Sequence, residues 1–258
     1  MKKLSLLRPL LSLLPLLPLL SCIFNFTASA QVAIPREVIP YNVSYHWGII
    51  NVSIAKGTVA VESDGTNFYG TLDGVSIPWE GHIICVSDTL SAQMYATGSG
   101  WSETVSYQSG WYRHPDVNTF RSNYYNPANP AIYRNIAGQG QYDASNDSME
   151  AIAVTSDMLG MYYFSHVIDF GALRPGDQVT IPISGGYSHE VVITYQGTGE
   201  YCVNGCTYPT YDCSFEYGYR GRMSGYPVEC RIGVRDRIPM FLSASLPVGR
   251  VEMLYDPD

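Results

Sequence analysis

The histidines are the side chains of this chain best suited to metal binding or acid–base catalysis. None has the H-x-x-x-H or H-x-H spacing that brings two imidazoles to one metal ion. Near the end of an expected helix, His166 fits an imidazole that interacts with the helix dipole or with Asp169. We therefore predict no metal site, no cofactor and no catalytic residue. The five histidines are His46, His82, His114, His166 and His189.

Carboxylate pairs are the other candidates for chemistry, because two acidic residues can cleave a glycosidic bond. Glu80 with Asp88, and Asp147 with Glu150, are such pairs. A β-protein with 23 Asp+Glu offers many of them, and sequence does not define their separation. We interpret them as solvated surface residues. A glycan-active hydrolase is thus the least favoured function, and we expect the protein not to be an enzyme.

Four cysteines cluster late in the chain, and two disulfides among them are expected if the protein reaches an oxidising compartment. The alternative is a metal site, but paired C-x-x-C sequences and a neighbouring histidine are absent. The connectivity stays open at this point. Cys85, in HIICVSD, is expected to be a buried thiol. The disulfide candidates are Cys202, Cys206, Cys213 and Cys230.

Arginines recur at even spacing in YRGR and RIGVRDR, which would place those of each strand on one face. If the strands are neighbours, the guanidinium groups could bind a phosphate or a glycan carboxylate. The favoured interpretation is an outer sheet face on which they pair with acidic residues of adjacent strands. The anion-patch candidates are Arg220, Arg222, Arg231, Arg235 and Arg237.

Aromatic residues and methionines are candidates for the lining of a cavity. The first interpretation is core filling, but pliable and amphipathic side chains also suit a lipid or another hydrophobic ligand. The ligand-lining candidates are Tyr45, Trp47, Met158, Met161, Tyr162 and Tyr163.

Strands must position most of these residues. Residues 41–50, YNVSYHWGII, alternate apolar and polar side chains, which predicts a half-buried strand with Tyr45 and Trp47 on its buried face. The apolar phase changes at Ile49 and Ile50, which indicates a turn or bulge. Two hairpins are expected, one around Ser184-Gly185-Gly186 and one turning at residues 247–249.

A helix is expected over residues 155–170, capped by Thr155, Ser156 or Asp157. An apolar helix in a β-protein must bury itself against the sheet. We therefore predict an all-β, mainly antiparallel fold. It would be a curved, barrel- or clam-like sheet of roughly ten strands with one short helix packed on its concave face.

Residues 1–30 have the features of a secretory signal peptide: three cations, the run LLSLLPLLPLL and the cleavage sequence Ala28-Ser29-Ala30. A lipid anchor at Cys22 is a disfavoured alternative, because the apolar IFNF follows it. We predict export to the periplasm or outer envelope. One β-rich domain is expected over residues 31–258, without another run of the roughly 18 apolar residues that a membrane span needs.

The charge balance narrows the class of partner. Removal of residues 1–30 takes three cations and no anion, so 12 Lys+Arg face 23 Asp+Glu and the net charge becomes −11, compared with −8 for the whole chain. Such an acidic chain is not expected to bind nucleic acid, and anionic membrane surfaces should repel it.

Three segments together resemble a family of exported bacterial proteins, domain of unknown function 3108. They are Y-x-W-G-I followed by A-K-G-T-V-A-V, then SDMLGMYY followed by LRPGD, and finally DRIP followed by VGRVEML. The resemblance spans roughly residues 40–255 and implies an envelope protein with a curved antiparallel sheet and a helix against it. By analogy with periplasmic lipid carriers, we predict a binder of a hydrophobic or amphipathic ligand. An envelope assembly protein with a filled core is the alternative, and the protein partners stay open.

Overall fold

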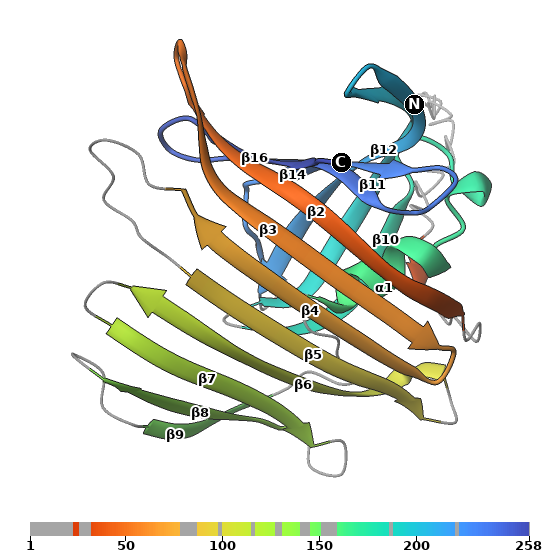
Figure 1. Cartoon of the computed structure of the whole chain (residues 1–258). Coiled ribbons are helices and arrows are strands. Elements are labelled where there is room, and N and C mark those ends of the chain that lie inside the picture. Colours follow the sequence, from red (N-terminus) through yellow and green to blue (C-terminus); the bar gives the residue numbers. More distant parts are fainter. Residues whose placement is uncertain are drawn as a thin grey trace, which may run out of the picture.

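Sixteen strands, joined in one sheet, make up most of the described chain (Figure 1). The computed structural model describes residues 23–25, 32–77, 87–97, 100–114, 117–126, 131–139, 145–150, 159–185, 188–219 and 222–257. It describes side chains for residues 32–77, 159–181, 190–218 and 222–257.

The strands of the first half are β1 (Ile23–Asn25), β2 (Ala33–Trp47), β3 (Ile50–Asp64), β4 (Asn67–Ser76), β5 (Ser87–Thr97), β6 (Gly100–His114), β7 (Val117–Asn126), β8 (Ala131–Gln139) and β9 (Ser145–Glu150). Those of the second half are β10 (Gln178–Gly185), β11 (Ser188–Val203), β12 (Cys206–Tyr219), β13 (Arg222–Met223), β14 (Val228–Gly233), β15 (Pro239–Ser245) and β16 (Arg250–Tyr255). Between the halves lie the helix α1 (Gly160–Val167) and a 3₁₀ turn, η1 (Phe170–Ala172).

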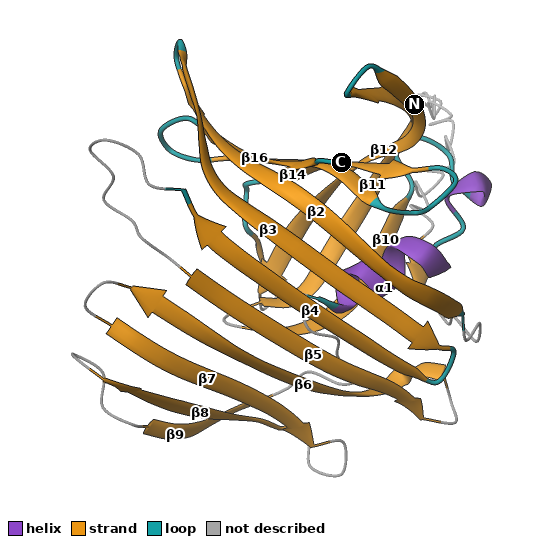
Figure 2. Cartoon of the chain, viewed as in Figure 1, coloured by secondary structure: helices purple, strands orange, loops and turns teal. Residues whose placement is uncertain are grey.

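The two halves join where the last strand, β16, pairs with β2. The order is β1-β10-β11-β12-β14-β15-β16-β2-β3-β4-β5-β6-β7-β8-β9, with β13 beside β12. Apart from the parallel pair of β1 and β10, the pairings of the described strands are antiparallel. Strands β10 to β16 curl around α1 and face β2 to β4, whereas β5 to β9 continue the sheet away from the curl (Figures 1 and 2). The predicted fold class is confirmed, although the described strands outnumber the roughly ten expected.

The three expected turns are present. Gly185 pairs with Ser188 in the β10–β11 hairpin, and Ser245 pairs with Arg250 in the β15–β16 hairpin. Trp47 pairs with Ile50 and closes a two-residue turn in which Gly48 has a φ of +58°. Glycine suits that conformation because it has no Cβ.

The prediction that Trp47 lies on the buried face is wrong, since its side chain is 56% exposed, whereas Tyr41 on the same strand is 2% exposed. Between Tyr41 and Trp47, a register shift at Val43 and Ser44 interrupts the alternation of buried and exposed side chains. The β2–β3 hairpin then projects beyond the curl (Figure 1), so no second layer of the described chain covers its tip.

Helix α1 is shorter than the predicted helix, beginning at Gly160 and ending at Val167. The proposed caps Thr155, Ser156 and Asp157 lie outside the described residues, and Leu159 takes the N-cap position without a side-chain cap. Five of its eight residues are buried, as expected for a helix enclosed on more than one side.

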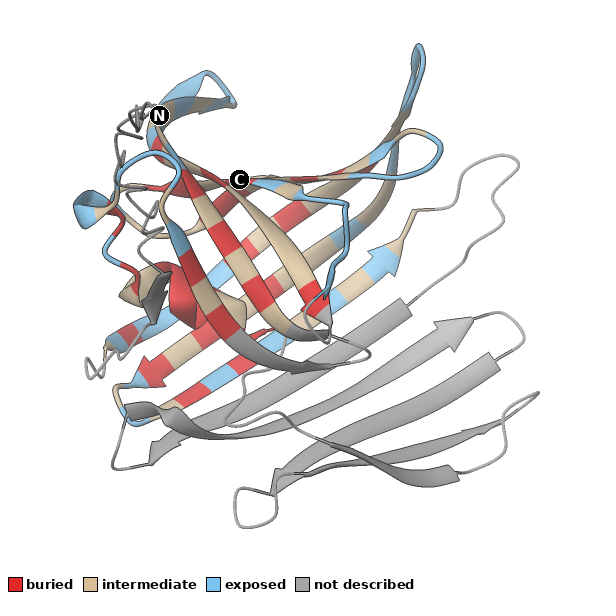
Figure 3. Ribbon diagram, turned by 180° about the vertical axis from the view of Figure 1, so that it is seen from behind, coloured by how far each residue is buried: buried red, intermediate tan, exposed pale blue. Residues whose placement is uncertain are grey.

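The buried core has two clusters, which meet at α1 (Figure 3). Tyr163 packs edge to face on Phe68 of β4, with ring centroids 5.7 Å apart. Phe164 belongs to the other cluster, with strands β10, β11, β12 and β14. The helix therefore holds the two sides of the curl together by burial of its aromatic side chains.

Replacing Gly249 by alanine is expected to weaken the β16–β2 junction. Gly249 has a φ of +76°, and an added Cβ would clash with the carbonyl oxygen of His46. Gly48→Ala is the control, because Gly48 also has a positive φ but open space around it. We expect a loss of about 2–4 kcal/mol in the free energy of unfolding for Gly249→Ala and about 1 kcal/mol for Gly48→Ala. Equal losses in urea unfolding would contradict the close packing at this junction.

Candidate functional site

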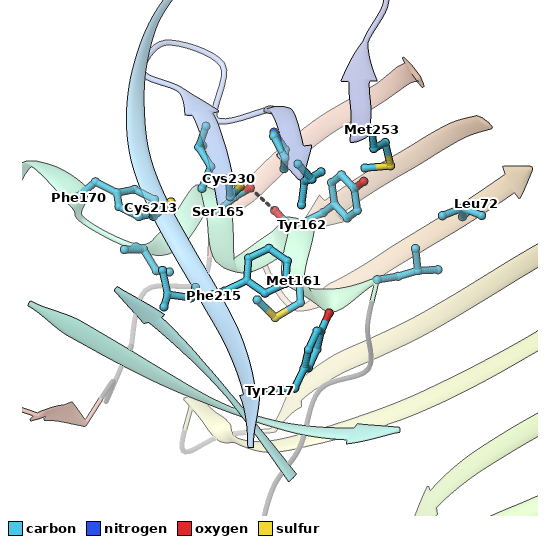
Figure 4. Close-up of a pocket in the computed structure, with 16 residues that line it drawn as sticks. Leu72, Met161, Tyr162, Ser165, Phe170, Cys213, Phe215, Tyr217, Cys230 and Met253 are labelled. Atoms are coloured by element: carbon cyan, nitrogen blue, oxygen red, sulfur yellow. Dashed lines mark hydrogen bonds between the residues drawn. The ribbon is translucent and has the colours of Figure 1, made fainter. Parts of the chain in front are cut away.

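A cavity of about 410 Å³ lies between α1 and the concave face of the sheet (Figure 4). Its size falls within the range of ligand pockets, about 300–1,000 Å³. The helix, the 3₁₀ turn and six strands supply its wall. The lining residues are Leu72, Leu159, Met161, Tyr162, Ser165, Ile168, Phe170, Ile193, Cys213, Phe215, Tyr217, Cys230, Ile232, Pro239, Leu242 and Met253.

Among the described residues, the lining has no charged side chain and few polar atoms. The Ser165 hydroxyl is already used, because it donates a 2.6 Å hydrogen bond to the Tyr162 carbonyl oxygen. An ion inside would lose its hydration without gaining a counter-charge. The cavity therefore suits an apolar chain or an uncharged amphipathic group.

Tyr162 of the cavity lining and Tyr41 of β2, which is not a lining residue, have hydrogen-bonded hydroxyls. Tyr41 donates a 2.7 Å hydrogen bond to the carbonyl oxygen of Pro239. Tyr162 is hydrogen-bonded to Tyr41, and since Tyr41 has only one proton to donate, Tyr162 is the donor between them. Burial raises the pKa of both phenols above their ordinary value, so they remain neutral.

Tyr217 differs from this pair because its hydroxyl lacks a hydrogen-bond partner within the described part of the chain. Its ring packs edge to face on Phe215, and Figure 4 places it beside Met161. Burial raises the pKa of Tyr217 to about 12. The hydroxyl is thus a neutral donor available to the polar end of a ligand.

The tyrosines predict a loss of stability at alkaline pH. The unfolded chain loses each phenolic proton near pH 10, whereas folded Tyr217 keeps its proton until about pH 12. Its contribution is fully present below about pH 10 and disappears as the pH rises towards 12. Urea unfolding across this interval should show a falling free energy of unfolding, with a shallower fall for Tyr217→Phe. Tyr226→Phe, at an exposed tyrosine, is the control and should leave the slope unchanged; an unchanged slope for Tyr217→Phe would contradict the burial.

The structure separates the five described lining candidates into three groups. Met161 and Tyr162 line the cavity. Tyr163 packs in the neighbouring cluster, where its hydroxyl accepts a hydrogen bond from the backbone of Val32. Tyr45 and Trp47 lie on the projecting hairpin, where the Tyr45 hydroxyl donates to the Val248 carbonyl. Met158 lies outside the described residues.

Sequence reasoning missed the contribution of β12, which presents Cys213, Phe215 and Tyr217 to the cavity. Their spacing of two residues is the strand period, so the alternation in CSFEYGY was the available signal. The position of β12 across the cavity from α1 could not be predicted from that pattern, because it depends on contacts between distant segments.

The arginines of β14 and its following turn do not share one face. Arg231 lies 3.9 Å from the carboxylate of Asp212 on β12, the cross-strand pairing expected of an outer face. Arg237 instead lies over the ring of Tyr211, 4.8 Å from its centroid, on the cavity side. The even spacing fails because β14 ends at Gly233 and Arg237 has a φ of +62°. Arg222 and Arg235 are exposed, and Arg220 lies outside the described residues.

The two histidines whose side chains are described, His46 and His166, make structural contacts. His166 donates from Nδ1 to the Tyr162 carbonyl at 2.8 Å, as expected for an imidazole at a helix end. Its acidic neighbour is Glu37 of β2, 3.4 Å away, rather than the predicted Asp169. His46 lies 2.8 Å from Glu252 on the outer face. Within the described residues, no three His, Cys, Asp or Glu side chains gather as metal ligands.

Glu80 lies outside the described residues, and the side chains of Asp88, Asp147 and Glu150 are likewise not described. Cys85 also lies outside the described part of the chain. None of the helices in that part is both long and apolar enough to cross a membrane.

Comparisons with known proteins support the fold. No protein-family model matches the chain, and no curated protein matches it significantly. Among solved structures, it is similar to a beta-barrel-like protein of domain of unknown function 1849 from Brucella abortus. The TM-score is 0.53 at 8% identity, over 87% of this chain and 97% of that one. At this identity the likeness shows a β-barrel-like fold alone, and the resemblance to domain of unknown function 3108 stays a prediction.

Proposed function

We propose that this protein binds a hydrophobic or amphipathic ligand in the cavity between α1 and the sheet and acts as a carrier rather than an enzyme. The observation that supports the proposal is a cavity of about 410 Å³ whose described lining residues are uncharged, bordered by the two buried clusters of the core. An interior that serves stability alone has few voids larger than a water molecule. Tyr217 would hold the polar end of the ligand.

We also propose that the protein is an exported envelope protein related to domain of unknown function 3108, with a cleaved signal peptide over residues 1–30. Strand β1 lies within that segment, so cleavage after Ala30 would remove it and leave β10 at the edge of the sheet. Lipidation at Cys22 stays the disfavoured alternative. Export to an oxidising compartment would favour disulfides among the late cysteines.

Two neighbouring hairpin tips favour a second candidate function, an envelope interaction protein. Trp47 and Ile49 on the β2–β3 turn are exposed, as are Leu246 and Val248 on the β15–β16 turn. The Tyr45–Val248 hydrogen bond joins the two turns. Exposed apolar patches often mark contact surfaces.

Native mass spectrometry of the gently purified protein tests the carrier proposal. We expect a population heavier than the bare chain by the mass of one hydrophobic molecule, released by organic solvent. The double variant Trp47→Ser/Ile49→Ser should keep this molecule, since the hairpin tip lies away from the cavity. Detection of the bare chain alone would reject binding in the cavity and favour the interaction function. Loss of the bound molecule in the double variant would do the same.

A further inference from the structure

The two exposed cysteines at the end of the β11–β12 hairpin face away from each other. Cys202 lies opposite Thr207, and Cys206 lies opposite Val203. Residues that lie opposite each other share a face of the sheet, and successive residues alternate between faces. Cys202 and Cys206 therefore project from opposite faces, which opposes a disulfide between them.

The two buried cysteines, in contrast, lie on the same face of the sheet. Cys213 of β12 lies directly opposite Cys230 of β14, and a side-chain hydrogen bond joins their thiols. Opposite residues of an antiparallel pair have Cα atoms about 4.5–5.5 Å apart. This separation lies within the range of about 4.4–6.8 Å that a disulfide spans.

A disulfide between one of the hairpin cysteines and one of the buried cysteines would have to span too great a distance. Cys206 precedes Cys213 by seven positions on the same strand, a separation of roughly 23 Å at the rise of a β-strand. Cys202 lies at the same end of the hairpin as Cys206, because its partner in the sheet is the adjacent residue Thr207. A disulfide cannot bridge more than about 7 Å between Cα atoms without backbone movement.

We propose that Cys213 and Cys230 form a cross-strand disulfide in the wall of the cavity, while Cys202 and Cys206 remain unpaired with each other. In the reaction, the thiolate of one cysteine attacks a low-molecular-weight disulfide and releases one thiol. The second thiolate then displaces the other half as a thiol. Two S–H bonds and the S–S bond of the oxidant are lost, and one protein S–S bond and two small thiols are formed.

The disulfide would tie β12 to β14 and enclose the segment that carries β13. Both sulfurs line the cavity, so the bond would also fix the width of its wall at this point. The hydrogen bond to Cys213 and burial raise the pKa of the Cys230 thiol, which makes the reactive thiolate scarce once the strands are packed. We therefore expect the bond to form during folding. The inference goes beyond ligand binding and does not depend on it.

The test uses protein that has been stripped of ligand, unfolded in reductant and refolded in a mixture of reduced and oxidised glutathione. The variant Cys202→Ser/Cys206→Ser isolates the proposed pair from the hairpin cysteines. After unfolding and alkylation without reduction, we expect Cys213 and Cys230 to be protected and their peptides to be joined. The midpoint of thermal unfolding should fall by roughly 5–10 °C on reduction.

Cys213→Ser is the matched control, in which Cys230 should become alkylated and reduction should no longer lower the midpoint. Alkylation of both cysteines after oxidative refolding of the double variant would overturn the proposal, and so would a peptide that joins either of them to Cys85. Because no ligand is present, a negative result would leave the carrier proposal untouched. Absence of a co-purified ligand would likewise leave the disulfide proposal untouched.

Discussion

The variant Met161→Trp is expected to bind a fluorescent acyl probe at least roughly tenfold more weakly than the unaltered protein. Met161 is half-buried on α1, and its side chain points into the cavity (Figure 4). An indole in its place would occupy space that the acyl chain needs. Because the residue borders an open space, the extra atoms should cost less than the roughly 1–3 kcal/mol of overpacking a filled core.

Met223→Trp is the matched control for this prediction. Met223 lies exposed on β13, away from the cavity lining, and gains the same atoms. Fluorescence titration should give unchanged affinity for this variant, and both variants should unfold cooperatively in urea. Equal affinity in Met161→Trp and the unaltered protein would show that the probe binds elsewhere.

Phe170→Ala should lower the free energy of unfolding by about 3–5 kcal/mol. Phe170 is 0% exposed and stacks on Tyr211 of β12, with centroids 5.1 Å apart. The Arg237 guanidinium lies 5.8 Å from the same ring, and one of its buried nitrogens has no hydrogen-bond partner among the described residues. Removal of the ring therefore costs apolar burial, aromatic stacking and part of the environment of a buried cation.

Phe241→Ala provides the control, because Phe241 carries similar contacts on the outer face. Arg231 lies 5.3 Å from its ring and Tyr201 5.9 Å away, but the residue is only partly buried. For Phe241→Ala we expect a loss of about 1 kcal/mol in the free energy of unfolding, because the ring of Phe241 buries less apolar surface than the ring of Phe170. Urea unfolding of the two variants compares them directly, and equal losses would contradict the place of Phe170 at the centre of the core.

The local parts of the fold could be predicted from the sequence. Strand alternation and turn residues predicted two hairpins and a turn or bulge at Ile49 and Ile50. The apolar spacing in residues 155–170 predicted a helix, of which the structure shows Gly160–Val167. These signals depend on neighbours in sequence, because turn chemistry and strand period act over a few residues. The composition of the helix also predicted its burial on the concave face.

The remaining features depend on pairings between distant segments. The junction of β16 with β2 joins residues some 200 positions apart, and the opposition of Cys213 and Cys230 depends on the register of β12 and β14. Trp47 was misplaced because a register shift and the length of the hairpin cannot be recognised in the alternation of YNVSYHWGII. Tyr217 was missed because its role arises only where β12 faces α1.

The carrier account is tested most directly by a crystal structure of the protein with a bromine-labelled fatty acid. The account predicts anomalous density for the bromine between α1 and strands β12 and β14, in contact with Met161 or Phe215. Bromine density confined to the exposed tips around Trp47 and Val248, or no bound fatty acid at all, would contradict it.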